Sequence, residues 1–183
     1  MNTQALWYLS RGTGVVALLL LTATLVLGLL NAGRLAGERW PRFAISAIHR
    51  NVSLLSLVFL VIHIVSSIID PYAGIRWLDA VLPFVSSYRS FWLGLGALSG
   101  DLMLAVLITS LLRPRINYRV WRAIHWLGYA VWPIALVHGI GTGITDDHVA
   151  WVLISDVGCG LAVLVALWWR LGTTHQDTQA RAR

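Results

Sequence analysis

The stretch AIHWLGYAVWPIALVHG, residues Ala123–Gly139, is apolar enough to lie within a membrane, yet it carries two histidines. It belongs to a run from Val120 to Gly139 that only Arg122 interrupts, and Val15–Gly33 is a second, uncharged run. A helix of about 20 apolar residues spans a bilayer. Across the chain 57% of residues are hydrophobic and 12% are charged, which is about half the charged fraction of a soluble domain. The sequence therefore predicts an all-α membrane protein.

Five segments have the length and composition of membrane-spanning helices. They run over about Gly14–Gly33, Phe43–Ile69, Phe91–Leu112, Tyr118–Ile140 and Val149–Leu171. The first could instead be a cleaved signal peptide, but its apolar core is long and we expect a retained helix. We divide the chain into a membrane domain, residues 1–172, and a polar cytoplasmic tail, residues 173–183, in which we expect no regular structure.

The charges predict the orientation of these spans. The formal net charge is +6, and the loops that would share one side of the membrane carry most of the arginines. These are Arg34, Arg39 and Arg42, then Arg113, Arg115, Arg119 and Arg122, and finally Arg170, Arg181 and Arg183; the opposite loops hold Asp70, Asp79, Asp146 and Asp147 with Arg76 and Arg89. The positive-inside rule places the N-terminus outside and the C-terminus in the cytoplasm of a multi-pass cell-membrane protein. Arginines beside apolar runs indicate membrane topology and contact with the bilayer, so we expect no nucleic-acid partner.

The loop from Pro71 to Ser90 contains IRWLDAVLPFV, with apolar residues at helical spacing. A short helix lying in the outer membrane interface would fit this pattern. An ordinary packed loop fits it equally well.

Four of the six histidines lie within predicted spans, where an ionisable residue is costly and usually faces the bundle interior. They are His49 and His63 in the second span and His125 and His138 in the fourth, whereas we expect His148 and His175 to be solvated. At a rise of about 1.5 Å per residue, the two histidines of each span are roughly 20 Å apart. Both spans run in the same direction. We therefore expect His49 to face His125 near the cytoplasmic side (the inner pair) and His63 to face His138 near the outer side (the outer pair).

Two neutral imidazoles facing each other inside a bundle are typical axial ligands of a haem iron. A zinc or di-iron site would need three or four ligands at one depth, which the split between two depths disfavours. Hydrogen bonding of each histidine across helices is a third explanation, which four matched histidines make less attractive. The sequence thus predicts a helical bundle enclosing stacked haems.

The angular positions of the histidines around each helix fit the predicted pairing in the second span but not in the fourth. Fourteen residues bring His63 within about 40° of the face of His49, but thirteen residues leave His138 about 140° from the face of His125. Pro133 lies between the latter two and removes a backbone hydrogen bond. We therefore predict a kink or local rewinding of the helix at Pro133.

Several charged residues are candidates for supporting roles. Arg50 and Arg122 adjoin the inner histidines and could bind haem propionates, or they could contact lipid headgroups. On the outer side Arg76 and Arg89 are the available cations. Asp101 and Asp156 fall within spans, where they could relay a proton, hydrogen-bond a ligating histidine or pair with a neighbouring helix.

Two segments, IHRNVSLLSLVFLVIHIVSS (Ile48–Ser67) and YRVWRAIHWLGYAVWPIALVHGIGTG (Tyr118–Gly143), resemble the ferric reductase-like transmembrane family. That family includes ferric reductases, NADPH oxidases and the haem-binding subunit of a methionine-sulfoxide reductase system. The resemblance runs from Ala5 to about Arg170. It implies two b-type haems, one held by the inner pair and one by the outer pair. It also implies a haem-dependent transmembrane oxidoreductase that moves electrons from a cytoplasmic donor to an acceptor at the outer face.

The chain departs from that family in two respects. Members often have six spans, and many continue into a flavin- and NAD(P)H-binding domain, whose glycine fingerprint this sequence lacks. We therefore expect a separate electron donor, a flavoprotein or a quinol, and a small-molecule or protein acceptor. Two other functions stay open: a quinone-linked cytochrome b anchor subunit of a larger dehydrogenase complex, and a haem-free membrane scaffold.

Overall fold

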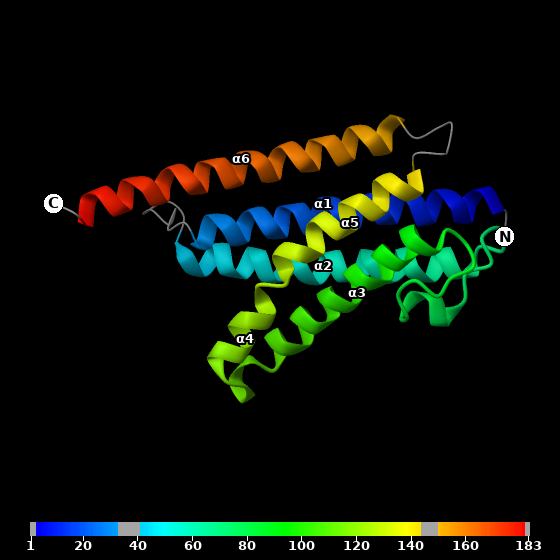
Figure 1. The fold of residues 1–183 in the computed structure, drawn as a ribbon, viewed down its shortest axis with the longest axis horizontal. Coiled ribbons are helices and arrows are strands. Elements are labelled where there is room, and N and C mark those ends of the chain that lie inside the picture. Colours follow the sequence, from blue (N-terminus) through cyan, green and yellow to red (C-terminus); the bar gives the residue numbers. More distant parts are fainter. Residues whose placement is uncertain (1–2, 33–40, 144–149, 182–183) are drawn as a thin grey trace.

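The computed structural model describes residues 3–32, 41–143 and 150–181, and it is helical throughout its membrane part (Figure 1). The helices are α1 (Thr3–Ala32), α2 (Arg42–Ile69), η1 (Trp77–Ala80), α3 (Ser90–Leu111), η2 (Arg113–Arg115), α4 (Tyr118–His125), α5 (Gly128–Gly143) and α6 (Ala150–Arg181). Five segments of this part are long and apolar enough to cross a membrane, with α4 and α5 forming one of them. The predicted five-span, all-α membrane protein is thereby confirmed.

Several charged residues and histidines of the sequence lie outside the residues that the structure describes. They are Arg34, Arg39, Asp146, Asp147, His148 and Arg183, together with the side chains of Arg42, His175 and Arg181.

Two predicted boundaries were wrong. Helix α1 begins at Thr3, well before Gly14, because the intervening residues include no helix breaker other than Gly12 and only one charge, Arg11. Helix α6 continues to Arg181 through the tail that was expected to lack structure, since that segment has no proline to stop helix propagation. Of the two interpretations left open for Pro71–Ser90, the loop is observed, and it contains only the single turn η1. Pro83 cannot donate a helical hydrogen bond, and Phe84 adopts a positive φ of 67°.

Helices α1 and α2 form an antiparallel pair in a fixed register. Side chains of α2 at seven-residue intervals donate hydrogen bonds to carbonyls of α1 at the same interval. These bonds join His49 to Thr24 (3.0 Å), Ser56 to Ala17 (3.1 Å) and His63 to Ser10 (2.8 Å). A seven-residue period matches helices wound at about 3.5 residues per turn, as in a left-handed coiled pair. The fourteen-residue spacing of His49 and His63 therefore keeps both on the face toward α1.

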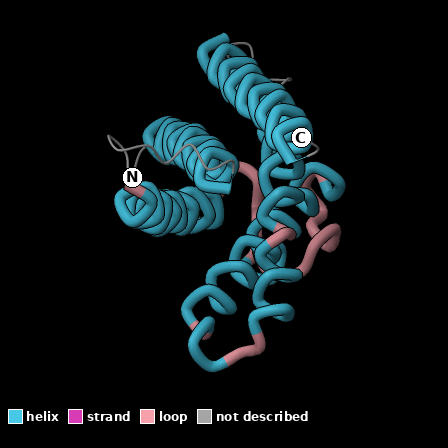
Figure 2. The backbone as a smooth tube through the Cα atoms, turned by 90° about the vertical axis from the view of Figure 1, so that its left-hand side faces the viewer, coloured by secondary structure: helices cyan, strands magenta, loops and turns pink. Residues whose placement is uncertain are grey.

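The remaining helices complete the bundle on one side of this pair. Helix α3 packs against α5, and α6 packs against α1 and α5. Figure 2 looks along the helices and shows the α1–α2 pair on one side of the bundle, with the other helices beside it. The buried core joins α1, α5 and α6 through Leu18, Trp132, Cys159 and Val163. Within it the Trp132 indole donates a 2.8 Å hydrogen bond to the Thr22 hydroxyl.

The fourth span is interrupted, but not at the predicted position. Helix α4 ends at His125 and α5 begins at Gly128, whereas Pro133 lies inside α5. Hydrogen bonds of the tighter 3₁₀ type cross the break, from Leu127 to Ile124, Tyr129 to Trp126 and Ala130 to Leu127. Residues wound in this way turn about 120° each rather than about 100°. The tightening therefore removes part of the angular offset between His125 and His138.

Pro133 still contributes to this break. It cannot bond the Tyr129 carbonyl, and its ring crowds that oxygen. The tightened stretch reaches Ala130, directly after Tyr129. A distortion therefore lies between the two histidines as predicted, but upstream of Pro133 rather than at it.

Candidate functional site

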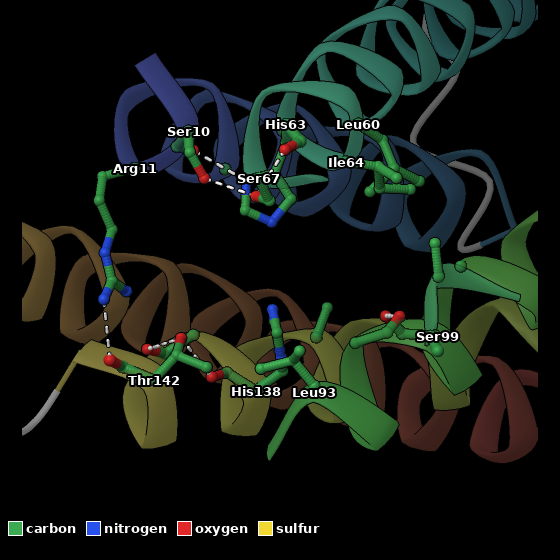
Figure 3. Close-up of a pocket in the computed structure, with 18 of the residues that line it drawn as sticks. Ser10, Arg11, Leu60, His63, Ile64, Ser67, Leu93, Ser99, His138 and Thr142 are labelled. Atoms are coloured by element: carbon green, nitrogen blue, oxygen red, sulfur yellow. Dashed lines mark hydrogen bonds between the residues drawn. The ribbon is translucent and has the colours of Figure 1, made fainter. Parts of the chain in front are cut away.

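The outer pair faces across the space between the α1–α2 pair and α5 (Figure 3). The ring centroids of His63 and His138 are 6.3 Å apart, and the ring planes make an angle of 76°. His63 Nδ1 donates to the Ser10 carbonyl at 2.8 Å, and His138 Nδ1 donates to the Trp92 carbonyl at 2.7 Å. A carbonyl only accepts, so each Nδ1 carries the proton and each Nε2 keeps its lone pair. Both rings are thus prepared to bind a metal through Nε2.

The inner pair has nearly the same separation. The centroids of His49 and His125 are 6.4 Å apart, with an angle of 63° between the planes. His49 Nδ1 donates to the Thr24 carbonyl at 3.0 Å. His125 Nδ1 is buried and has no hydrogen-bond partner among the described residues. Its ring instead stacks on Trp121, with centroids 4.9 Å apart and planes 24° apart.

Both separations fit one metal ion held between two imidazoles. Metal–imidazole bonds of about 2.0 Å on opposite sides of an ion place the ring centroids roughly 6 Å apart. In the described part of the chain, no three histidine, cysteine or acidic side chains converge as a zinc or di-iron site would require. The donor set at each level is two imidazoles, which is the set that a bis-histidine haem uses.

Three of the four rings share one supporting arrangement. Each Nδ1 donates to the carbonyl of a residue in a neighbouring helix, and the residue four positions later in that helix is glycine. The carbonyl and glycine are Ser10 and Gly14 for His63, Thr24 and Gly28 for His49, and Trp92 and Gly96 for His138. Helical side chains tilt toward the N-terminus, so a side chain at the glycine position would cover that carbonyl. Glycine therefore opens the carbonyl to the imidazole.

The fit is tighter at the outer pair. A Cβ added to Gly14 would lie 2.9 Å from His63 Nδ1, and one added to Gly96 would lie 2.6 Å from His138 Cε1. At Gly28 the nearest atom, His49 Cε1, would be 3.6 Å away, an ordinary van der Waals distance. A larger residue would therefore collide with the imidazole at Gly14 and Gly96 but not at Gly28.

Sequence analysis missed these supports. The acceptors are backbone atoms, which no residue type reveals. A signal was nevertheless present: Gly14 and Gly28 repeat the fourteen-residue spacing of His49 and His63 on the antiparallel helix.

The cations near the outer pair are Arg89, which was expected, and Arg11, which was not. Arg11 of α1 donates to the Thr142 carbonyl at 3.0 Å, and Arg89 donates to the same oxygen at 2.9 Å. Arg11 lines the cavity that also contains His63 and His138, and it reaches across it in Figure 3. Arg11 was not among the cations expected at this site. Its position one residue after an acceptor carbonyl, at the outer end of α1, brings it to the site.

Arg76 is instead engaged within η1. Its guanidinium lies 2.7 Å from the Asp79 carboxylate, whose oxygens also accept the Arg76 backbone N–H. These hydrogen bonds lower the pKa of Asp79 and raise the pKa of Arg76.

The cations expected at the inner pair lie on the surface. Arg50 and Arg122 are exposed, and neither guanidinium forms a hydrogen bond or an ion pair with another described residue. Arg113 is the basic residue in contact with the inner site, since its guanidinium lies 4.5 Å from the centroid of Trp121.

The two intramembrane acids have different positions. Asp156 is 2% exposed, lines the cavity near Gly139, and has no hydrogen-bond partner among the described residues for either carboxyl oxygen. Asp101 is half-buried on α3 and does not line that cavity.

These features define a multi-pass helical membrane protein with two facing histidine pairs, one at each of two depths. The chain matches the family model described as "Ferric reductase like transmembrane component" over residues 13–136, more than half its length, and it belongs to that family. The match includes His49, His63 and His125 and ends just before His138. Comparison with curated proteins and with solved structures gave no match. Membership in this family, which is generally haem-binding, indicates an oxidoreductase that transfers electrons across a membrane.

Proposed function

We propose that the chain binds two b-type haems, one between His49 and His125 and one between His63 and His138, and conducts electrons between the two faces of the membrane. The observation that carries this proposal is the ring separation, 6.4 Å and 6.3 Å, which is nearly equal at both levels and suits one metal ion between two imidazoles. The two levels are fourteen residues apart on α2, roughly 21 Å along the helix. Two sites at this spacing divide the width of the bilayer into short steps.

When bound, each haem would supply an iron that accepts and releases one electron at a time. The chain's own residues set the conditions. The carbonyls of Ser10, Thr24 and Trp92 hold three imidazoles in one tautomer and raise their basicity as ligands. The surrounding apolar helices exclude water, so protein dipoles rather than solvent surround the metal.

The orientation follows from the charges. We place the inner pair on the cytoplasmic side and the outer pair near the outer face of the cell membrane, with the N-terminus outside. Arg50 and Arg122 would bind the inner propionates, and Arg11 with Arg89 would supply positive charge at the outer site. A separate flavoprotein or quinol would donate electrons on the cytoplasmic side. A small molecule or a protein would accept them outside.

The first test is the haem content of the purified full chain. After haem-replete expression, we expect two haems per chain and reduced-minus-oxidised absorption bands of the b type. A colourless protein would overturn the proposal in favour of a haem-free scaffold. A ratio of one haem per chain would overturn the two-site assignment.

The second test addresses conduction across the membrane. The chain is reconstituted into vesicles that enclose ferricyanide, and a membrane-impermeant reductant is added outside. We expect ferricyanide to be reduced in vesicles that contain the chain and not in vesicles with the haem-free double variant His49→Ala/His63→Ala. Equal rates in both would show that the chain is not the conductor.

A further inference from the structure

The inner histidine His125 is the exception among the four rings. The other three each donate Nδ1–H to a carbonyl that a glycine uncovers. His125 has no such acceptor among the described residues, although its Nδ1 is buried. A ligand without a hydrogen-bonded second nitrogen needs another means of orientation, because that bond normally fixes the ring.

We propose that Trp121 is the positioning residue of His125, and that ring stacking replaces the carbonyl hydrogen bond that orients the other three histidines. The inference rests on the proposed function, in that His125 is taken to bind a haem iron. The two rings lie four residues apart on α4, so they share one face of that helix. Their planes are 24° from parallel with centroids 4.9 Å apart, which is a stacked contact.

Trp121 is itself held from two sides. Its indole N–H donates to the Ser110 hydroxyl of α3 at 3.4 Å. The Arg113 guanidinium covers its ring at 4.5 Å, a cation–π distance. The stack therefore connects His125 through Trp121 to the end of α3 and to the turn that follows it.

The backbone at this point explains the need for such a support. His125 is the last residue of α4, and the regular helical hydrogen bonds give way to 3₁₀ bonds from Leu127 on. His138, by contrast, lies well inside α5. A ligand at a helix end is fixed less firmly by its own backbone, so its side chain depends more on neighbouring groups.

The experiment compares Trp121→Leu and Trp121→Phe with Trp126→Leu in the full-length, haem-loaded chain. Trp126 is a matched control because it adjoins His125 in sequence, is 58% exposed and packs on Tyr129 rather than on the histidine. The readouts are the haem-to-protein ratio and the electron paramagnetic resonance spectrum of the ferric low-spin haems. That spectrum is sensitive to the angle between the two imidazole planes, 63° at the inner pair. The inner signal is the one that His49→Ala removes.

We expect Trp121→Leu to shift or abolish the inner signal and to lower the haem ratio toward one per chain. Trp121→Phe keeps an aromatic face and should retain both haems with a small shift. Trp126→Leu should leave both signals unchanged. A wild-type inner signal and full haem content in Trp121→Leu would overturn the proposal, as would equal losses in Trp126→Leu.

Two further variants decide the matter if Trp121→Leu does not fold. Ser110→Ala and Arg113→Gln each leave the indole in place and remove one of its supports, so the inner signal should shift while the outer one stays. An unchanged inner signal in both would overturn the proposal. A wild-type chain without haem refutes the proposed function instead, so the two failures are distinguishable.

Discussion

The outer and inner pairs place their rings almost equally far apart, at 6.3 Å and 6.4 Å, yet they are supported differently. In the outer pair both rings donate to carbonyls, and both carbonyls are uncovered by glycines with no room for a methyl group. In the inner pair, His49 also donates to a carbonyl, but its glycine, Gly28, has room for a methyl group. His125, at the end of α4, stacks on Trp121 instead. The two pairs therefore share the separation of their rings but not the contacts that support the rings.

Removal of a ligand tests the pairs themselves and should have the largest effect. We expect His63→Ala or His138→Ala to abolish the outer haem, and His49→Ala or His125→Ala to abolish the inner one. Each variant should bind one haem per chain, as measured by absorbance against protein concentration. Retention of both haems in all four variants would refute the assignment of ligands.

A methyl group at the supporting glycines tests this difference between the pairs. Gly96→Ala forces a Cβ to within 2.6 Å of His138, whereas Gly28→Ala places one at 3.6 Å from His49. Overpacking of this kind costs roughly 1–3 kcal/mol, so the outer haem should bind about 10- to 100-fold more weakly in Gly96→Ala. Gly28→Ala should be close to wild type and serves as the control. Haem transfer to apomyoglobin gives the relative affinities, and equal loss in both variants would contradict the comparison.

The cations should tune the two sites separately. Removal of a positive charge near a haem favours the ferric form, which carries the greater positive charge, and so lowers the reduction potential. We expect Arg11→Gln to lower the potential of the outer haem only and Arg122→Gln to lower that of the inner haem only, in a redox titration followed by absorbance. Arg115→Gln, a change in a neighbouring exposed arginine, is the control for general effects of charge.

The smallest effect concerns the turn η1, which lies beyond both pairs. Because the pKa of Asp79 is lowered by its hydrogen bonds to Arg76, the pair contributes stability above the ordinary Asp pKa of about 3.9. That contribution disappears as the pH falls through the lowered value. The fluorescence of Trp77, obtained by difference from Trp77→Phe, should change in this acid range. In Asp79→Asn the acid step should be absent, and a step that persists there would exclude this pair as its cause.

Much of the architecture was readable from the sequence because membrane insertion depends on simple quantities. Helices α2 and α3 begin and end within a residue of their predicted bounds, since apolar length decides where a span lies. Depth along a helix follows from counting, so the sequence also indicated which histidines meet. The role of those histidines as ligands stays a prediction.

The features that the sequence did not predict depend on backbone geometry and on how the helices pack. The break after His125 lies upstream of Pro133, so the position of the proline in the sequence does not mark it. Carbonyl acceptors carry no residue signature at all. The stack of Trp121 on His125 was present as an i, i+4 pair, but an aromatic residue near a span end more often marks the membrane interface.

The seven-residue register between α1 and α2 has a consequence for how such a conduit can change its length. Insertion of one residue in α2 between His49 and His63 would turn one imidazole away from its carbonyl, and so would a matched pair of single insertions in both helices. Insertion of a whole heptad in each helix would keep both contacts and move His49 and His63 apart by roughly 10 Å along α2. While the hydrogen bonds to α1 are kept, the distance between His49 and His63 along α2 can therefore change only in steps of seven residues.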